Sequence, residues 1–210
     1  MNPFTNLFTN HYYINLEIRE DRNKNAIHEL SKLGIQPNRF DAIKTKDGLV
    51  GCALSHIKLL EIAKEKDLPY IIIFEDDVVF SDIQELKYKL KKYINTEYDV
   101  LMMGTWFLNS NDYTIINDDL LRVNKSCCSH AYIIKNHYYQ TLIDNYKAGV
   151  KLKIKEPNNG RGNIDDYWHS IQKKDNWLCF NPPLASQRDG YSDNFNGIRN
   201  LYDRILNLPK

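Results

Sequence analysis

A continuous apolar run, Tyr70 to Phe74, limits the kind of sheet that this sequence can form. Its β-branched and aromatic residues favour a strand, and a strand that is apolar at every position needs cover on both faces. Pro69 ends the helical pattern that precedes it. We therefore predict a central parallel strand here, within a sheet that carries helices on both sides.

The first half of the chain alternates strand and helix patterns around this run. Further strands are predicted at residues 11–16, 39–43, 100–103, 115–116 and 131–134, and helices at 25–33, 50–66, 83–94, 138–146 and 166–172. This alternation predicts an α/β fold. The polar loop at 157–162 reads either as a mobile lid or as an ordinary surface connection, and no fold is predicted beyond residue 190.

Length and composition favour one domain over residues 1–210. The chain has 210 residues, of which 42% are hydrophobic, enough for one core.

A formal net charge of +1 provides no overall field for nucleic acid or an anionic membrane, so a charged ligand must be held locally. With no secretory signal pattern and no apolar stretch of about 20 residues, we expect a cytoplasmic chain without a membrane span. The four cysteines match no zinc or redox spacing and predict reduced thiols.

Three carboxylates, Glu75, Asp76 and Asp77, directly follow the buried strand. Ligands of open α/β sheets bind at the carboxyl ends of strands. Strand alternation predicts that Glu75 and Asp77 point the same way and Asp76 the other way. Two close carboxylates repel unless a cation lies between them, and Mn²⁺ or Mg²⁺ suits oxygen ligands and phosphates.

Two other interpretations of the triplet stay open. The carboxylates would be solvated if they only capped the next helix near residues 81–82. A phosphohydrolase or nucleotidyltransferase with a two-metal site would also use such a cluster. The cluster itself indicates metal and phosphate, not the reaction.

Basic and small residues near the first strand suggest how phosphates are held. Arg19 and Arg22 suit a diphosphate, although they would equally form surface ion pairs with neighbouring acids. Gly51 opens a predicted helix, where backbone amides favour phosphate. His56 lies among apolar helical positions, which favours a hydrogen-bonded structural role over direct catalysis.

Asp165 and Asp166 follow the polar loop. A carboxylate there would remove the proton of an acceptor hydroxyl, as glycosyl transfer requires. The alternative is a helix N-cap, for which Asp is a favoured residue.

In order along the chain, these segments resemble glycosyltransferase family 25, which includes bacterial lipooligosaccharide galactosyltransferases and procollagen galactosyltransferases. The resemblance rests on Tyr13-Ile14-Asn15-Leu16 with Arg19 and Arg22, Val50-Gly51-Cys52-Ala53-Leu54-Ser55-His56, Phe74-Glu75-Asp76-Asp77-Val78, Ser129-His130-Ala131-Tyr132-Ile133-Ile134, Ile164-Asp165-Asp166 and Gln187-Arg188-Asp189-Gly190-Tyr191-Ser192-Asp193. It spans nearly the whole chain and indicates a microbial or large-virus member.

The resemblance implies a GT-A-like, Rossmann-type fold with a mostly parallel central sheet, a UDP-hexose donor (UDP-galactose or UDP-glucose), Mn²⁺ or Mg²⁺, and transfer with inversion. The acceptor would be a collagen hydroxylysine or a lipopolysaccharide sugar. A nucleotide-binding and metal-binding half at about 11–105 would precede an acceptor-side half at about 106–210. A catalytically silent sugar-nucleotide-binding module is the third alternative, and the intact acidic clusters argue against it because buried like charges cost stability.

The implied site residues fall into three groups. The metal ligands are Glu75 and Asp77, and the base is Asp165 with Asp166 as second choice. The donor-binding residues are Asn15, Leu16, Arg19, Arg22, Gly51, Ser55, His56 and Asp76, while Gln187, Ser192 and Asp193 close the donor or acceptor pocket.

Overall fold

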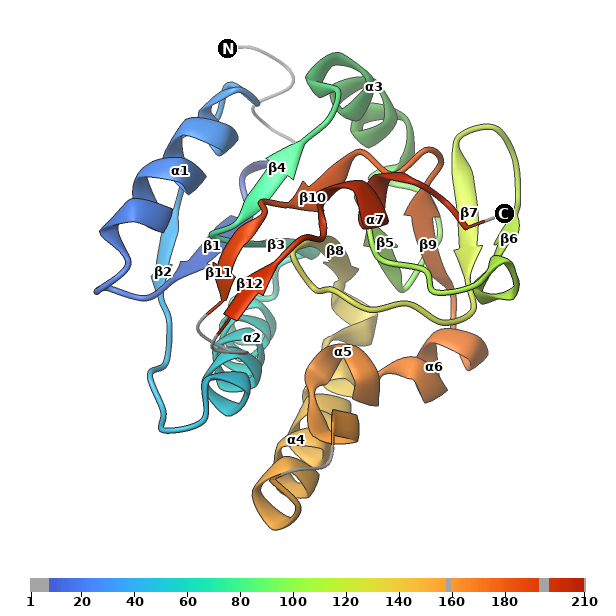
Figure 1. The fold of residues 1–210 in the computed structure, drawn as a ribbon. Helices are drawn as coiled ribbons and strands as arrows, with labels where there is room; N and C mark the ends of the chain where they lie inside the picture. The colour runs from blue at the N-terminus through green and yellow to red at the C-terminus, as the bar shows by residue number, and fades with distance from the viewer. Residues whose placement is uncertain (1–7, 158–159, 193–196, 210) are drawn as a thin grey trace.

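A computed structural model describes residues 8–157, 160–192 and 197–209, so Asp193 lies outside the described residues. Within them, an eight-stranded sheet has the order β2-β1-β3-β8-β5-β9-β7-β6 (Figure 1). Its strands are β1 (His11–Asn15), β2 (Arg39–Asp41), β3 (Tyr70–Glu75), β5 (Val100–Met102), β6 (Tyr113–Ile115), β7 (Leu120–Val123), β8 (Ala131–Lys135) and β9 (Trp177–Phe180).

The sheet is mixed in its pairing but mostly parallel in its strand directions. β1 pairs in parallel with β2 and β3, and β5 pairs in parallel with β9. β8 runs against β3 and β5, and β7 runs against β9 and β6, so all strands but these two share one direction. The predicted α/β sheet with β3 in its interior is confirmed, although only one of the two neighbours of β3 is parallel to it.

Alternate residues of β3 enter two different cores, which explains its apolar sequence. Ile71 and Ile73 pack with residues of α2 (Gly48–Glu65) and α4 (Tyr139–Lys155). Ile72 and Phe74 pack with residues of α1 (Glu20–Ser31) and α3 (Ile83–Tyr93) on the other face. Figure 1 shows these helix pairs on opposite sides of the sheet. Among the described residues, no helix is both long and apolar enough to cross a bilayer.

Some predicted boundaries differ from the structure. α4 continues to Lys155 instead of ending near residue 146, and the helix predicted at 166–172 is divided into α5 (Ile164–Tyr167) and α6 (His169–Lys174). Of the loop at 157–162, the short turn Gly160–Gly162 lies directly against Lys153 of α4, as in a surface connection, and residues 158–159 lie outside the described part.

The C-terminal part of the chain, for which no fold was predicted, covers the end of β3. β4 (Val78–Phe80) continues from β3 and pairs antiparallel with β10 (Ala185–Gln187). β11 (Gly190–Ser192) and β12 (Gly197–Arg199) form an antiparallel pair, and α7 (Tyr202–Leu206) follows them. Figure 1 shows these red elements beside β4 and in front of β1 and β3.

Candidate active site

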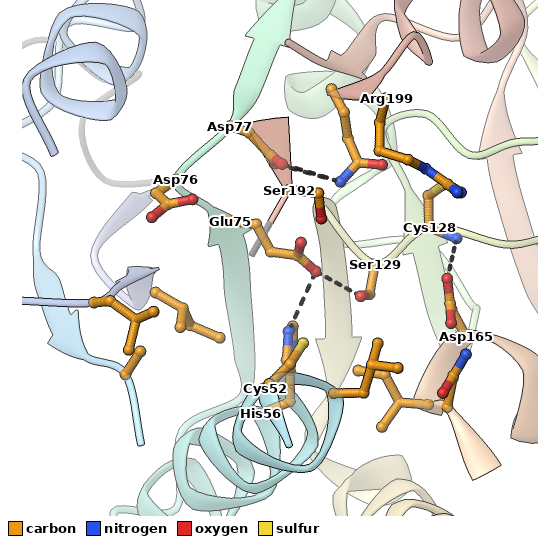
Figure 2. A pocket seen from close by; sticks show the side chains of 18 of the residues that line it. Cys52, His56, Glu75, Asp76, Asp77, Cys128, Ser129, Asp165, Ser192 and Arg199 are labelled. Atoms are coloured by element: carbon orange, nitrogen blue, oxygen red, sulfur yellow. Dashed lines mark hydrogen bonds and ion pairs between the residues drawn. The ribbon is translucent and has the colours of Figure 1, made fainter. Parts of the chain in front are cut away.

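A cavity of about 350 Å³ lies at the carboxyl ends of β1 and β3. Its walls come from the β2–α2 loop, the start of α2, the β3–β4 turn, the loop at 127–129, α5 and the β10–β12 region. Side chains from both sequence halves therefore face one space. Figure 2 shows Glu75, Asp76 and Asp77 on one side of this space and Asp165 on the other.

The acidic triplet sits at the bend between two sheets. β3 ends at Glu75, and Asp76 and Asp77 form the turn that leads into β4. The predicted strand alternation therefore stops at Glu75, and the turn instead orients the two aspartates. The helix-cap interpretation does not hold, because Asp82 caps α3 by accepting bonds from the amides of Gln84 and Glu85.

Glu75 points into the cavity from a hydrogen-bonded position. Its Oε1 accepts a 2.5 Å bond from Ser129 Oγ and lies 3.4 Å from His56 Nε2. Burial raises the pKa of Glu75, but the bonds from His56 and Ser129 together bring it below its usual value. His56 is buried, and its Nδ1 lies 2.7 Å from the hydroxyl of Tyr132, so it orients Glu75 from the core side as a hydrogen-bonded structural histidine.

Asp76 turns away from Glu75, toward β1 and α1. It accepts bonds from Asn15 Nδ2 at 2.8 Å and from Arg22 Nη1 at 2.7 Å. Arg22 also donates to the carbonyl of Tyr191 at 2.9 Å, which joins α1 to β11. Arg19 lines the cavity too, but its guanidinium pairs with Asp21 on the helix surface at 2.8 Å.

Asp77 carries more buried negative charge than its neighbours balance. Burial and the charge of Glu75 raise its pKa to about 7, against the opposing effect of Arg22. Arg22 Nη1 lies 3.5 Å from Asp77 but 2.7 Å from Asp76, so its positive charge mainly neutralises Asp76. Gln187 Nε2 donates to Asp77 at 3.3 Å. Two neighbouring half-buried carboxylates with so little compensation suit a cation, and the residues present therefore fit a hard divalent ion.

Asp165 faces these acids from α5. Its Oδ2 accepts a 3.1 Å bond from the amide of Cys128, and burial together with the charge of Asp166 raises its pKa to about 6. Asp166 Oδ2 accepts from Asn163 Nδ2 at 3.2 Å. The N-cap position of α5 belongs to Asn163, so neither aspartate serves as the helix cap.

Gly51 and Ser55, which the sequence grouped with the donor-binding residues, are not among the residues that line the cavity. Ser55 Oγ donates to the carbonyl of Gly51 and accepts from the amide of Ile43, each at 2.8 Å. Both residues therefore support the β2–α2 loop, whose residues 42–45 line the cavity. The other predicted donor-binding residues with described positions are among the lining residues: Asn15, Leu16, Arg19, Arg22, His56, Asp76, Gln187 and Ser192.

The structure adds residues to which the sequence assigned no role. Ser129 belonged to a quoted motif, but only the β3–β8 pairing shows that its hydroxyl reaches Glu75. Arg199 lines the cavity from β12, in a segment without periodic signal. Cys52 and Cys127 also line it, and their spacing predicted core thiols only.

A mostly parallel α/β sheet with an acid-lined cavity at its strand ends is the arrangement expected of a GT-A-like, Rossmann-type fold. Residues 46–155 match the family model described as glycosyltransferase family 25 (LPS biosynthesis protein), and the chain belongs to this family.

This chain is also similar to one curated protein and to one solved structure. A putative glycosyltransferase of Haemophilus influenzae is 36% identical over a match that covers 35% of this chain and 34% of the relative, so this chain spans about a third of the length of that protein. The crystal structure of a glycosyltransferase involved in the glycosylation of the major capsid of PBCV-1 superposes with a TM-score of 0.52 at 8% identity. That superposition covers 82% of this chain and 81% of the other, and it shows a shared fold.

Proposed function

We propose that this chain transfers a hexose, galactose or glucose, from a UDP-sugar to a hydroxyl acceptor in a metal-dependent, inverting reaction. The observation that carries the proposal is the placement of half-buried carboxylates on two facing walls of one cavity. Glu75 and Asp77 form one wall, and Asp165 stands on the other. Such an arrangement separates the end that holds a diphosphate from the end that activates an acceptor.

Glu75 and Asp77 would hold the metal ion, Mn²⁺ or Mg²⁺. Both contacts described for the Glu75 carboxylate reach Oε1, so Oε2 is left to face a ligand. When bound, such an ion supplies positive charge that stabilises a departing diphosphate. Arg22 and Arg199, which also line the cavity, would add donors for the diphosphate oxygens.

Asp165 would act as the general base, with Asp166 as second choice. A pKa of about 6 leaves Asp165 ionised at neutral pH yet basic enough to take a proton. One displacement then inverts the anomeric carbon: the acceptor oxygen attacks as Asp165 takes its proton, and the bond to the UDP oxygen breaks. The family description and the resemblance to lipooligosaccharide and procollagen transferases support a glycan or collagen-like hydroxyl as acceptor.

Calorimetric titration tests the donor. The protein would be titrated with UDP-galactose, UDP-glucose and a purine nucleotide, each with Mn²⁺ and with a chelator. We expect one UDP-hexose to bind only with the metal. If no uridine nucleotide binds under any condition, the proposed transferase function is wrong, and phosphate chemistry at the same acids becomes the better explanation.

A further inference from the structure

A second group of metal-binding side chains lies on the cavity wall, apart from the Glu75 and Asp77 carboxylates. Cys127 comes from the loop between β7 and β8, Asp166 from α5 and His169 from α6. Cys127 Sγ lies 3.9 Å from Asp166 Oδ1 and 3.7 Å from His169 Nε2. All three side chains are half-buried, and Cys127 and Asp166 line the cavity. A thiol, a carboxylate and an imidazole thus converge on one point.

The spacing of these three atoms is close to that of a tetrahedral zinc site. With Zn–S near 2.3 Å and Zn–N or Zn–O near 2.0 Å, neighbouring ligand atoms lie about 3.3–3.6 Å apart. The observed 3.7 Å and 3.9 Å exceed this by a few tenths of an ångström. The ligand atoms of all three residues lie within 4.8 Å of one another, so rotation of the side chains is the movement that would close the site.

A neighbouring residue already orients one of these ligands, and a second ligand would exchange its present partner for the metal. Asn163 Nδ2 holds Asp166 Oδ2 at 3.2 Å, which leaves Oδ1 facing Cys127. His169 Nε2 lies 3.1 Å from the carbonyl oxygen of Ser126, a contact that metal binding would replace. That carbonyl keeps a partner when the imidazole turns, because it also accepts a 2.8 Å bond from Trp168 Nε1. An outer contact such as that from Asn163 holds a metal ligand in place.

We propose that Cys127, Asp166 and His169 bind a divalent ion of the zinc class, with a fourth coordination position open to the cavity. On binding, the thiol of Cys127 releases its proton to solvent as the metal–sulfur bond forms. A sulfur and nitrogen donor set selects zinc-like ions, whereas the all-oxygen pair Glu75 and Asp77 suits Mn²⁺ or Mg²⁺. The two sites therefore differ in metal preference as well as in position.

Titration with Co²⁺ in excess Mg²⁺ tests this site directly, because Mg²⁺ occupies oxygen sites and cobalt reports its ligands by absorption. We expect a thiolate-to-cobalt charge-transfer band that zinc abolishes by displacement. Cys127→Ser should remove the band, and His169→Asn should weaken cobalt binding by about tenfold or more. Cys52→Ser is the matched control, since Cys52, His56 and Glu75 form the other such group within the described part of the chain, and this variant should keep the band.

Two results would overturn the proposal. One is the absence of a charge-transfer band in the wild-type protein at cobalt concentrations up to the millimolar range. The other is a band that disappears in Cys52→Ser and persists in Cys127→Ser, which would assign the thiolate ligand to the other cluster. Near-ultraviolet circular dichroism of each variant shows whether it has kept its fold.

An effect on catalysis follows if the proposed transferase function is right. An ion at this site would engage Asp166, the neighbour of the proposed base, and obstruct the acceptor wall. We expect zinc to inhibit transfer by the wild-type enzyme, and Cys127→Ser to need at least tenfold more zinc for half inhibition relative to its own uninhibited rate. Equal sensitivity of the two proteins would contradict this effect, whereas a cobalt band without any transfer would contradict only the proposed function.

Discussion

At the scale of single residues, the cavity concentrates carboxylates whose pKa values differ with their neighbours. The pKa of Glu75 is lowered by its bonds to His56 and Ser129, whereas burial raises those of Asp77 and Asp165. Groups of one chemical type thus acquire different roles through their surroundings. Two predictions follow from these values.

Asp77→Asn should abolish metal-dependent donor binding and stabilise the metal-free protein at pH 8. The folded protein holds a proton on Asp77 up to about pH 7, whereas the unfolded chain releases it near pH 3.8. The contribution of this group to stability therefore falls as the pH rises from about 4 to 7 and stays low above that. Removing the charge should raise the free energy of unfolding by about 1–2 kcal/mol, or the Tm by roughly 2–8 °C.

Thermal unfolding with and without Mn²⁺ measures both effects. Wild-type protein should gain Tm when Mn²⁺ is added, and the Asn variant should not. If the metal-free variant is less stable than wild type at pH 8, Asp77 is not the uncompensated charge that the structure indicates.

Asp165→Asn should retain donor binding and lose transfer, with kcat lowered by about 10²–10⁴-fold, because a general base contributes about this much. In the wild-type enzyme, kcat/KM should rise with pH through about 6 and then level off, since the carboxylate must be ionised to accept a proton. Calorimetry and initial rates separate the two effects. Near-wild-type turnover in the Asn variant would assign the base to another residue, with Asp166 the next to replace.

At the scale of elements, the first turns of α2 support the β2–α2 loop, and that loop lines the cavity. A Cβ atom on Gly51 would lie 2.4 Å from the carbonyl oxygen of Ile43. A Cβ atom cannot lie this close to a carbonyl oxygen, so any side chain at this position must displace the loop.

Gly51→Ala should weaken donor binding about tenfold, equal to about 1.4 kcal/mol, and lower stability by about 1–3 kcal/mol. Gly34→Ala is the matched control, because Gly34 has a φ of +77° and no atom within 4 Å of an added Cβ. Its backbone strain should lower the Tm without changing donor affinity. Equal donor affinities in both variants would show that the loop does not shape the donor site.

At the scale of the molecule, one sheet joins both halves of the sequence. β5 pairs with β8 and β9, so residues 100–102 depend on strands from the second half. We expect a single cooperative thermal transition, with calorimetric and van't Hoff enthalpies that agree. Two separated transitions would instead show that the halves at 11–105 and 106–210 are independent domains.

Local sequence patterns were sufficient to predict most strands of this sheet and to identify the acidic residues of the cavity. The run at Tyr70 to Phe74 predicted β3 because each face of the strand meets its own apolar core. The carboxylates beside it were recognisable because charge directly after a buried strand needs a ligand or a partner. The β10–β12 region was not predicted, since its three-residue strands are too short for a periodic signal.

Contacts between residues far apart in the sequence decided which side chains meet in the cavity. Arg19 and Arg22 are equivalent in the sequence, yet Arg22 reaches Asp76 and Arg19 pairs with Asp21. Cys127 and His169 are 42 residues apart and meet only because α6 packs beneath the β7–β8 loop. Propensity and periodicity act over a few residues, so they determine strands, helices and the residue types at their ends. Which charge meets which partner, and which thiol meets which imidazole, depends on packing across the whole chain, and this packing is absent from any local pattern.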